Sequence, residues 1–245
     1  MDTSVNFNPS ADFGFFWNRD QISWPALQAP DKKRAIWRAK KIFVEIIHDI
    51  TALEGNPFTV PEIQTLLDGV TVGGKKVSDA QQVLNQRDAL LHLFELVQSN
   101  QFALTPETAC ELQGIAAKGE ALKEGVFRDG KVTIAGTDYQ PPAATTLKDG
   151  FLRMAGAAGQ IEHPVEKAIA VFLHVARSQC FWDGNKRTGR LLMNGILLSA
   201  GQDIITVPAK EQLEFNTRMI RFYETGDGTE MMNFLANLQI RNKFE

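Results

Sequence analysis

From about residue 31 to the carboxyl end, apolar side chains recur at the spacing of an α-helix, and this periodicity restricts the chain to a mainly helical fold. In the clearest case, Leu90, Leu93, Phe94 and Val97 stand at positions i, i+3, i+4 and i+7. Such a spacing places all four side chains on one stripe of a helix, which can then be buried. We expect this helix to end near Asn100.

Helix start signals accompany the periodicity. Thr59 with Glu62 three residues later forms a capping box. Thr105 can cap a second helix, with Pro106 in the first turn, where a missing N–H costs nothing. After Pro141 the same pattern predicts five more helices, over residues 143–155, 164–178, 186–200, 209–223 and 229–240.

A single segment resembles a sheet. Residues 126–128 and 131–134 flank Asp129-Gly130, a dipeptide typical of a two-residue hairpin turn. Because two strands alone are marginal in water, we expect the hairpin to lie against the helical body. The sequence therefore predicts an all-α fold with one small β-hairpin.

Length and composition define the class of protein. A chain of 245 residues with 44% hydrophobic content can bury one large core, or a main domain with a helical extension. The first 20 residues lack a secretory signal, and no apolar run approaches the ~20 residues that span a bilayer. Two cysteines, Cys110 and Cys180, fit a reducing compartment. We predict a cytoplasmic protein that makes no contact with membranes.

The charge of the chain argues against a nucleic-acid partner. Its formal net charge is -3, whereas proteins held by phosphate contacts are usually basic. A basic run covers residues 32–41, but Ile36, Phe43 and Ile47 recur at helical spacing within and after it. We interpret the run as an amphipathic helix.

The strongest candidate site is the string Phe-Trp-Asp-Gly-Asn-Lys-Arg-Thr-Gly-Arg at residues 181–190. It predicts a tight turn that leads into a helix, whose first amides and dipole favour anions. Gly184 lets the backbone approach a ligand, and Arg187 and Arg190 share one helix face. Asp183 can hold Mg²⁺ beside these arginines. Together these residues favour a nucleoside triphosphate.

The same string resembles the signature of the Fic (filamentation induced by cAMP) family, His-x-Phe-x-Asp/Glu-Gly-Asn-Gly/Lys-Arg-x-x-Arg. The resemblance covers roughly residues 45–240 and implies a Fic-type helical bundle. It divides the chain into an N-terminal helical extension with an inhibitory motif, residues 1–60, and a Fic core, residues 61–245. Residues 126–134 resemble the family's flap, which would align a target protein by strand addition.

The resemblance implies roles for individual residues. Fic proteins most often transfer AMP from ATP to a hydroxyl of a target protein. By that likeness, Asp183 would hold Mg²⁺, and the cofactor-binding run would comprise Gly184, Asn185, Lys186, Arg187, Gly189 and Arg190. Within this run, Gly184 and Asn185 would cradle the α- and β-phosphates, Arg187 would neutralise their charge, and Arg190 would hold the γ-phosphate. Asn185, Arg187 and the residue at position 179 would form the catalytic set.

The chain departs from the signature at the motif histidine, because Gln179 stands in its place. An amide cannot accept a proton at neutral pH, so the general base is absent. A positioned base is typically worth about 10²- to 10⁴-fold in rate, whereas phosphate binding does not depend on it. We therefore expect nucleotide binding to persist while transfer falls. His174 lies about 140° away around its predicted helix, so we expect it in the core instead.

A second motif precedes the core. Residues 51–56 look like the inhibitory motif Ser/Thr-x-x-x-Glu-Gly/Asn of self-inhibited Fic proteins, with Thr51 one position later than the pattern has its hydroxyl residue. In that class the glutamate, here Glu54, pairs with the second motif arginine, here Arg190. The alternative is an ordinary helix end with a solvated acid at Glu54.

Three functions stay open on the sequence. The first is a self-inhibited adenylyltransferase that binds ATP and Mg²⁺ and has weak or absent activity because of Gln179. The second is an inactive nucleotide-binding or interaction module. The third is a Doc-like phosphotransferase, because some relatives with Lys at the position of Lys186 transfer the terminal phosphate. A homodimer also stays open, although we expect the aromatic residues near the amino terminus, such as Phe13 and Phe15, to pack within the chain.

Overall fold

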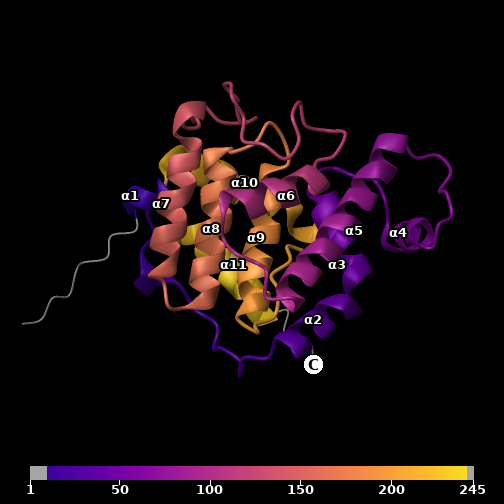
Figure 1. Ribbon diagram of the computed structural model, residues 1–245, viewed down its shortest axis with the longest axis horizontal. Coiled ribbons are helices and arrows are strands. Elements are labelled where there is room, and N and C mark those ends of the chain that lie inside the picture. Colours follow the sequence, from indigo (N-terminus) through magenta and orange to yellow (C-terminus); the bar gives the residue numbers. More distant parts are fainter. Residues whose placement is uncertain (1–9, 242–245) are drawn as a thin grey trace, which may run out of the picture.

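The computed structural model describes residues 10–241 as a bundle of helices (Figure 1). Its α-helices are α1 (Ser10–Phe13), α2 (Lys32–Lys41), α3 (Phe43–Ala52), α4 (Val60–Leu67), α5 (Val77–Gln98), α6 (Pro106–Ala116), α7 (Leu147–Gly159), α8 (Pro164–Ser178), α9 (Asn185–Ser199), α10 (Gln212–Thr225) and α11 (Thr229–Arg241). Three short 3₁₀ turns add to them, η1 (Arg19–Gln21), η2 (Ala144–Thr146) and η3 (Ala209–Glu211). No strand forms within residues 10–241, where the isolated bridge between Phe16 and Asp227 is the nearest thing to one. The predicted all-α class is confirmed.

Helices α8 and α9 form the centre of the bundle and pack closely on each other. Nearly every residue of both helices is buried, because neighbours cover them on several sides. Helices α5 and α6 lie against α9, while α7 and α11 lie against α8. The close approach depends on Gly189 of α9, where a Cβ would come within 3.0 Å of the Phe172 ring. The turn between α8 and α9 is therefore held by two buried helices.

The start signals in the sequence act as expected. Thr59 donates its backbone N–H to Glu62 Oε2 over 2.8 Å, within a complete capping box. Thr105 Oγ1 accepts a hydrogen bond from the Thr108 amide at the head of α6. Two predicted boundaries are early, since η2 and η3 precede α7 and α10. A 3₁₀ turn ahead of an α-helix is common and is hard to separate from it in a sequence.

The predicted hairpin at residues 126–134 is wrong, because this segment has no strand and belongs to the long loop between α6 and η2. Its backbone groups bond to another part of the chain and to a side chain of the segment itself. The Arg128 amide donates to Cys180 O over 2.9 Å, and the Arg128 guanidinium donates to Gly130 O over 2.6 Å. These groups are the ones that a strand partner would need, so tertiary contacts replace the ladder.

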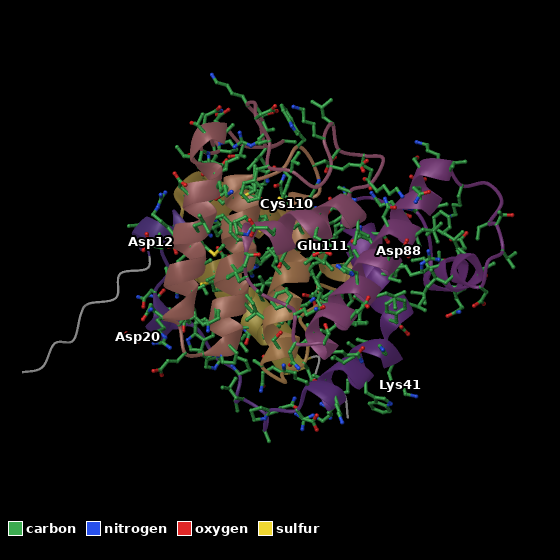
Figure 2. The ribbon with its side chains drawn as sticks, viewed as in Figure 1. Asp12, Asp20, Lys41, Asp88, Cys110 and Glu111 are labelled. Atoms are coloured by element: carbon green, nitrogen blue, oxygen red, sulfur yellow. The ribbon has the colours of Figure 1, made fainter. Side chains whose placement is uncertain are left out.

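The segment 14–31 crosses the bundle from α1 to α2, and we call it the N-terminal strap. Figure 2 shows Asp12 and Asp20 at one side of the molecule and Lys41 at the other. Phe16 exchanges backbone hydrogen bonds with Gly226 and Gly228, and Trp17 Nε1 donates to Glu166 Oε1. The expectation of packing within the chain is confirmed for the aromatic residues here except Phe16, which is 51% exposed.

Helices α2 and α3 pack on α5, and α2 also reaches α9. The division into an extension, residues 1–60, and a core, residues 61–245, stays a prediction, and residues 1–9 and 242–245 lie outside the described part. None of the helices within residues 10–241 combines the length and the apolar character that a bilayer crossing needs.

Candidate functional site

The candidate site is the turn from Gln179 to Gly184, which links α8 to α9 beneath the loop that follows α6. Two of its residues have left-handed backbones, Gln179 with φ 47° and Gly184 with φ 76°. A side chain at Gly184 would also meet the neighbouring loop, because a Cβ there would lie 2.8 Å from Ala117 Cβ. Glycine is therefore required at this position both by conformation and by space.

Asn185 fixes the shape of the turn. Its Oδ1 accepts from the Phe181 amide over 2.8 Å, and its Nδ2 donates to Phe181 O over 2.9 Å. The same Nδ2 also donates to Gln179 Oε1 over 3.1 Å, while Gln179 Nε2 donates to Ala176 O over 2.7 Å. Both ends of the Gln179 amide are thus bonded to the helices that flank the turn. Phe181 is fully buried and anchors the turn in the core.

Arg187 is almost completely buried, with 3% of its side chain exposed. Its Nη1 donates to Ala116 O over 2.9 Å and to Glu120 Oε1 over 2.6 Å. Its Nη2 lies 3.3 Å from Asp183 Oδ1. Burial opposes the charged guanidinium, but the hydrogen bond and charge of Glu120 outweigh burial and raise the pKa of Arg187. The arginine is therefore charged and held by two carboxylates.

Arg190 is equally buried and pairs with the candidate inhibitory residue. Its Nη2 donates to Glu54 Oε1 over 2.8 Å, and Lys186 Nζ lies 3.7 Å from Glu54 Oε2. Glu54 lies in the turn after α3, where Gly55 has φ 83°. The acid is mostly buried, which differs from the solvated helix end that was the alternative.

The charges at this contact explain its ionisation. Burial opposes the negative charge of Glu54, but the charges of Arg190, Lys186 and Arg187 outweigh burial and hold the pKa of its carboxyl below the usual value. Burial lowers the pKa of Arg190, and the Glu54 carboxylate only partly offsets it. Near neutral pH the contact is therefore a buried ion pair.

Several donors at the head of α9 have no protein partner. Arg187 Nε, Arg190 Nε and Arg190 Nη1 are buried and make no hydrogen bond. An unfilled buried donor costs free energy, and more so when it carries charge. Donors of this kind at a helix start are suited to the oxygens of a phosphate chain.

Asp183 is the most open of the charged groups here, with 54% of its side chain exposed. One of its oxygens accepts from the Gly184 amide and faces Arg187. Within the described residues, no three His, Cys, Asp or Glu side chains gather closely enough to hold a metal alone. A lone carboxylate beside phosphate-binding groups fits Mg²⁺, which keeps several waters and takes its other ligands from the phosphates.

Sequence reasoning missed three residues that shape the site. Glu120 reaches Arg187 from the loop, and Gln113 bridges Asp183 O and the Gly125 amide over 3.1 and 2.6 Å. The guanidinium of Arg128 is buried without a carboxylate in hydrogen-bonding reach and donates to carbonyl oxygens, among them Gln179 O over 2.6 Å and Pro142 O over 2.6 Å. Each of the three stands alone in the sequence, so no spacing pattern marks it.

His174 lies in the core, as expected, with 5% exposure. Its Nδ1 contacts Phe13 O over 2.9 Å, and its Nε2 lies 3.3 Å from Ser178 Oγ. Burial lowers the pKa of this histidine to about 4. It is neutral near pH 7, and its contacts are to α1 and to its own helix.

Part of the chain that includes the candidate site matches a known protein family. Residues 103–197 match the model of the Fic/DOC family. The turn and the head of α9 lie inside the matched range.

Curated relatives are named for one activity. The chain is 28% identical over 230 residues to a protein adenylyltransferase Fic from Nematostella vectensis, across 91% of this chain and 49% of the relative. A protein adenylyltransferase Fic from Drosophila yakuba is 28% identical over 231 residues, across 86% of this chain and 46% of the relative. The chain therefore spans about half the length of the curated relatives that it matches.

Solved structures share the fold. A Fic domain containing signaling protein from Bacteroides thetaiotaomicron has a TM-score of 0.71 at 19% identity, across 95% of this chain and 92% of that one. A fragment of Fic-1 from C. elegans has a TM-score of 0.68 at 20% identity, across 87% and 63%. The helical arrangement is thus the Fic fold.

Proposed function

We propose that this chain binds ATP at the head of α9 and is a protein adenylyltransferase of the self-inhibited class, with transfer slowed by Gln179. One observation carries the proposal: the buried guanidinium of Arg190 pairs with Glu54 and leaves Nε and Nη1 unpartnered. The names of the curated relatives supply the nucleotide and the group transferred. The ion pair between Arg190 and Glu54 supports weak binding of ATP in the resting state.

The residues divide the triphosphate among them. The amides at the start of α9, around Gly184 and Asn185, would donate hydrogen bonds to the α- and β-phosphates, where Arg187 adds charge. Arg190 takes the γ-phosphate once Glu54 has left it, because a carboxylate and a phosphate compete for the same guanidinium. Mg²⁺ on Asp183 would neutralise the phosphates and favour departure of diphosphate.

Transfer forms a bond between a target hydroxyl oxygen and the α-phosphorus, and breaks the bond between that phosphorus and the bridging oxygen to the β-phosphate. Diphosphate leaves with the electron pair of the broken bond, and the hydroxyl proton must go to a base. Gln179 cannot take this proton, so it passes to water at a lower rate. Residues 126–134 are the proposed docking segment for the target, since the Trp182 ring of the turn packs against Gly130.

An inactive nucleotide-binding module is the second candidate, and the bonding of Gln179 favours it. The amide caps the last turn of α8 through Ala176 O and orients Asn185. A residue with both polar atoms engaged in the turn has a structural task that needs no chemistry. A chain of this kind would bind nucleotide and signal its presence without modifying a partner.

The test uses ATP labelled at the α- or the γ-phosphate, with the purified chain in a cell extract. We expect little α-label on protein with the native chain, more with Gln179→His, and more again when Glu54→Gln is added. Gain of about 10²-fold or more is the expected size for a restored base. Label from the γ-phosphate alone would instead support the Doc-like reaction through Lys186.

Matched variants control for changes in fold. Gln160→His adds a histidine at the exposed end of α7, and Glu45→Gln removes an exposed acid on α3. Neither should alter labelling. Calorimetry with ATP and Mg²⁺ completes the test. Binding by Glu54→Gln without any label on protein would support the inactive module, whereas no binding by any variant would contradict a nucleotide site.

A further inference from the structure

A second carboxylate occupies the site, and it comes from a different part of the chain. Glu120 lies in the turn that follows α6 and contacts Arg187 over 2.6 Å, with 26% of its own side chain exposed. Glu54 contacts Arg190 in a similar way over 2.8 Å. Each of the two arginines is thus paired with a glutamate that an incoming phosphate would have to displace.

Counting the groups in contact gives a cluster without formal net charge. Arg187, Arg190 and Lys186 contribute the positive charges, and the contacting carboxylates of Glu54, Glu120 and Asp183 contribute the same number of negative ones. Anion sites attract their ligands through excess positive charge. In this conformation Glu120 therefore lowers the attraction for phosphate as much as Glu54 does.

The turn that carries Glu54 is joined to Glu120 by two hydrogen bonds through α5. Asn56, two residues after Glu54, donates its Nδ2 to Gln82 Oε1 over 3.0 Å. Gln82 Nε2 in turn donates to Glu120 Oε2 over 3.0 Å. Asn56 is anchored further, because its Nδ2 also donates to Asp79 O and its Oδ1 accepts from the Phe58 amide. Movement of the turn that carries Glu54 would strain the bond from Gln82 to Glu120.

We propose that Glu120 is a second acidic restraint on nucleotide binding, coupled to the Glu54 turn through Asn56 and Gln82. This inference rests on the proposed function, because it assigns Arg187 to a nucleotide. The two restraints act at different phosphates. Glu54 competes with the γ-phosphate at Arg190. Glu120 competes at Arg187 with the α- and β-phosphates, which ADP also has.

The first experiment measures ADP and ATP affinity by calorimetry with Mg²⁺ present. Glu120→Gln keeps the size of the side chain and removes its charge, so we expect ADP to bind at least about fivefold more tightly. Glu54→Gln should tighten ATP binding far more than ADP binding. Glu107→Gln, which removes an exposed acid on α6, is the control and should change neither affinity.

The second experiment tests the coupling. In the native background the gains of Glu54→Gln and Glu120→Gln in ATP affinity should not multiply, because each change weakens the other's contact through Gln82. In a Gln82→Ala background the two gains should multiply. Gln81→Ala, at the exposed neighbouring position, should leave the native behaviour in place.

The outcomes separate this inference from the proposed function. If Glu54→Gln binds ATP but Glu120→Gln leaves ADP affinity unchanged or weakens it, Glu120 merely positions Arg187 and the restraint is refuted. Multiplying gains in the native background would refute the coupling. If the double variant Glu54→Gln with Glu120→Gln binds no adenine nucleotide, both the nucleotide site and the restraint are overturned. Thermal unfolding of each variant identifies a loss that comes from misfolding.

Discussion

Two residues of the turn show how strictly a site of this kind fixes its backbone. Gln179 holds a left-handed conformation that costs a residue with a side chain of order 1 kcal/mol, and its amide bonds offset the cost. Gly184 adopts the same left-handed conformation without this cost. Its backbone also lies so close to Ala117 that a side chain would not fit. The first residue could be replaced, whereas the second has no alternative.

Gly184→Ala should destabilise the fold by about 1–3 kcal/mol and abolish nucleotide binding, because the new methyl group is strained and meets Ala117. Gly74→Ala is a matched control, since Gly74 also has φ 76° but has nothing within 4 Å of a built Cβ. Urea unfolding and calorimetry measure the two effects. Equal losses in both variants would show that the contact with Ala117 contributes nothing.

The candidate site at residues 181–190 could be predicted from the sequence because its polar and charged residues follow one another along the chain. The carboxylate and amide contacts could not. Glu120, Gln82 and Asn56 come from three separate segments, and each is an ordinary polar residue in its own neighbourhood. Only the packing of α5 against α3, α4 and α6 brings them together.

At the scale of elements, the long loop between α6 and η2 replaces the expected hairpin. Asp129-Gly130 is a correct turn signal, but a turn signal is local and does not say what the flanking backbone bonds to. Here Arg128 bonds to the carboxyl end of α8 and to Pro142, where a cation also interacts well with the helix dipole. One buried side chain thus decides the conformation of the whole segment.

Arg128→Met should expose this dependence. The change leaves carbonyl oxygens at Gln179, Gly130 and Pro142 without their donor, so we expect about 2–4 kcal/mol lower free energy of unfolding in urea. Protease cleavage within residues 117–142 should become faster. Lys131→Met, at an exposed position of the same loop, should do neither. An unchanged cleavage rate in Arg128→Met would contradict the role.

At the scale of the whole molecule, the N-terminal strap fastens the start of the described chain to its end. Its bonds reach Glu166 on α8, Thr229 and Asn233 on α11, and Gln202 after α9. The sequence predicted burial of aromatic side chains here but no path, because the strap has no periodicity and most of its bonds use the backbone. His174 links α1, directly before the strap, to the central helix pair.

Low pH should weaken the contact that His174 makes with Phe13. The pKa of His174 is about 4 in the fold and about 6.5 in the unfolded chain, so the unfolded state binds its proton first as pH falls. Stability is therefore lost between about pH 6.5 and pH 4, by up to about 3 kcal/mol from this residue. Urea unfolding across this range should be less pH-dependent in His174→Gln than in the native protein. An equal slope in both proteins would contradict the assignment.

The balanced cluster at the head of α9 has a consequence for the selectivity of the proposed nucleotide site. Free sulfate or inorganic phosphate carries only negative charge. The paired glutamates leave the cluster without excess positive charge to attract it. A metal-bound nucleotide brings its own cation together with many contact points, and so can offset the loss of both pairs at once. The resting protein should therefore bind small anions weakly and still bind a nucleotide that carries a metal ion.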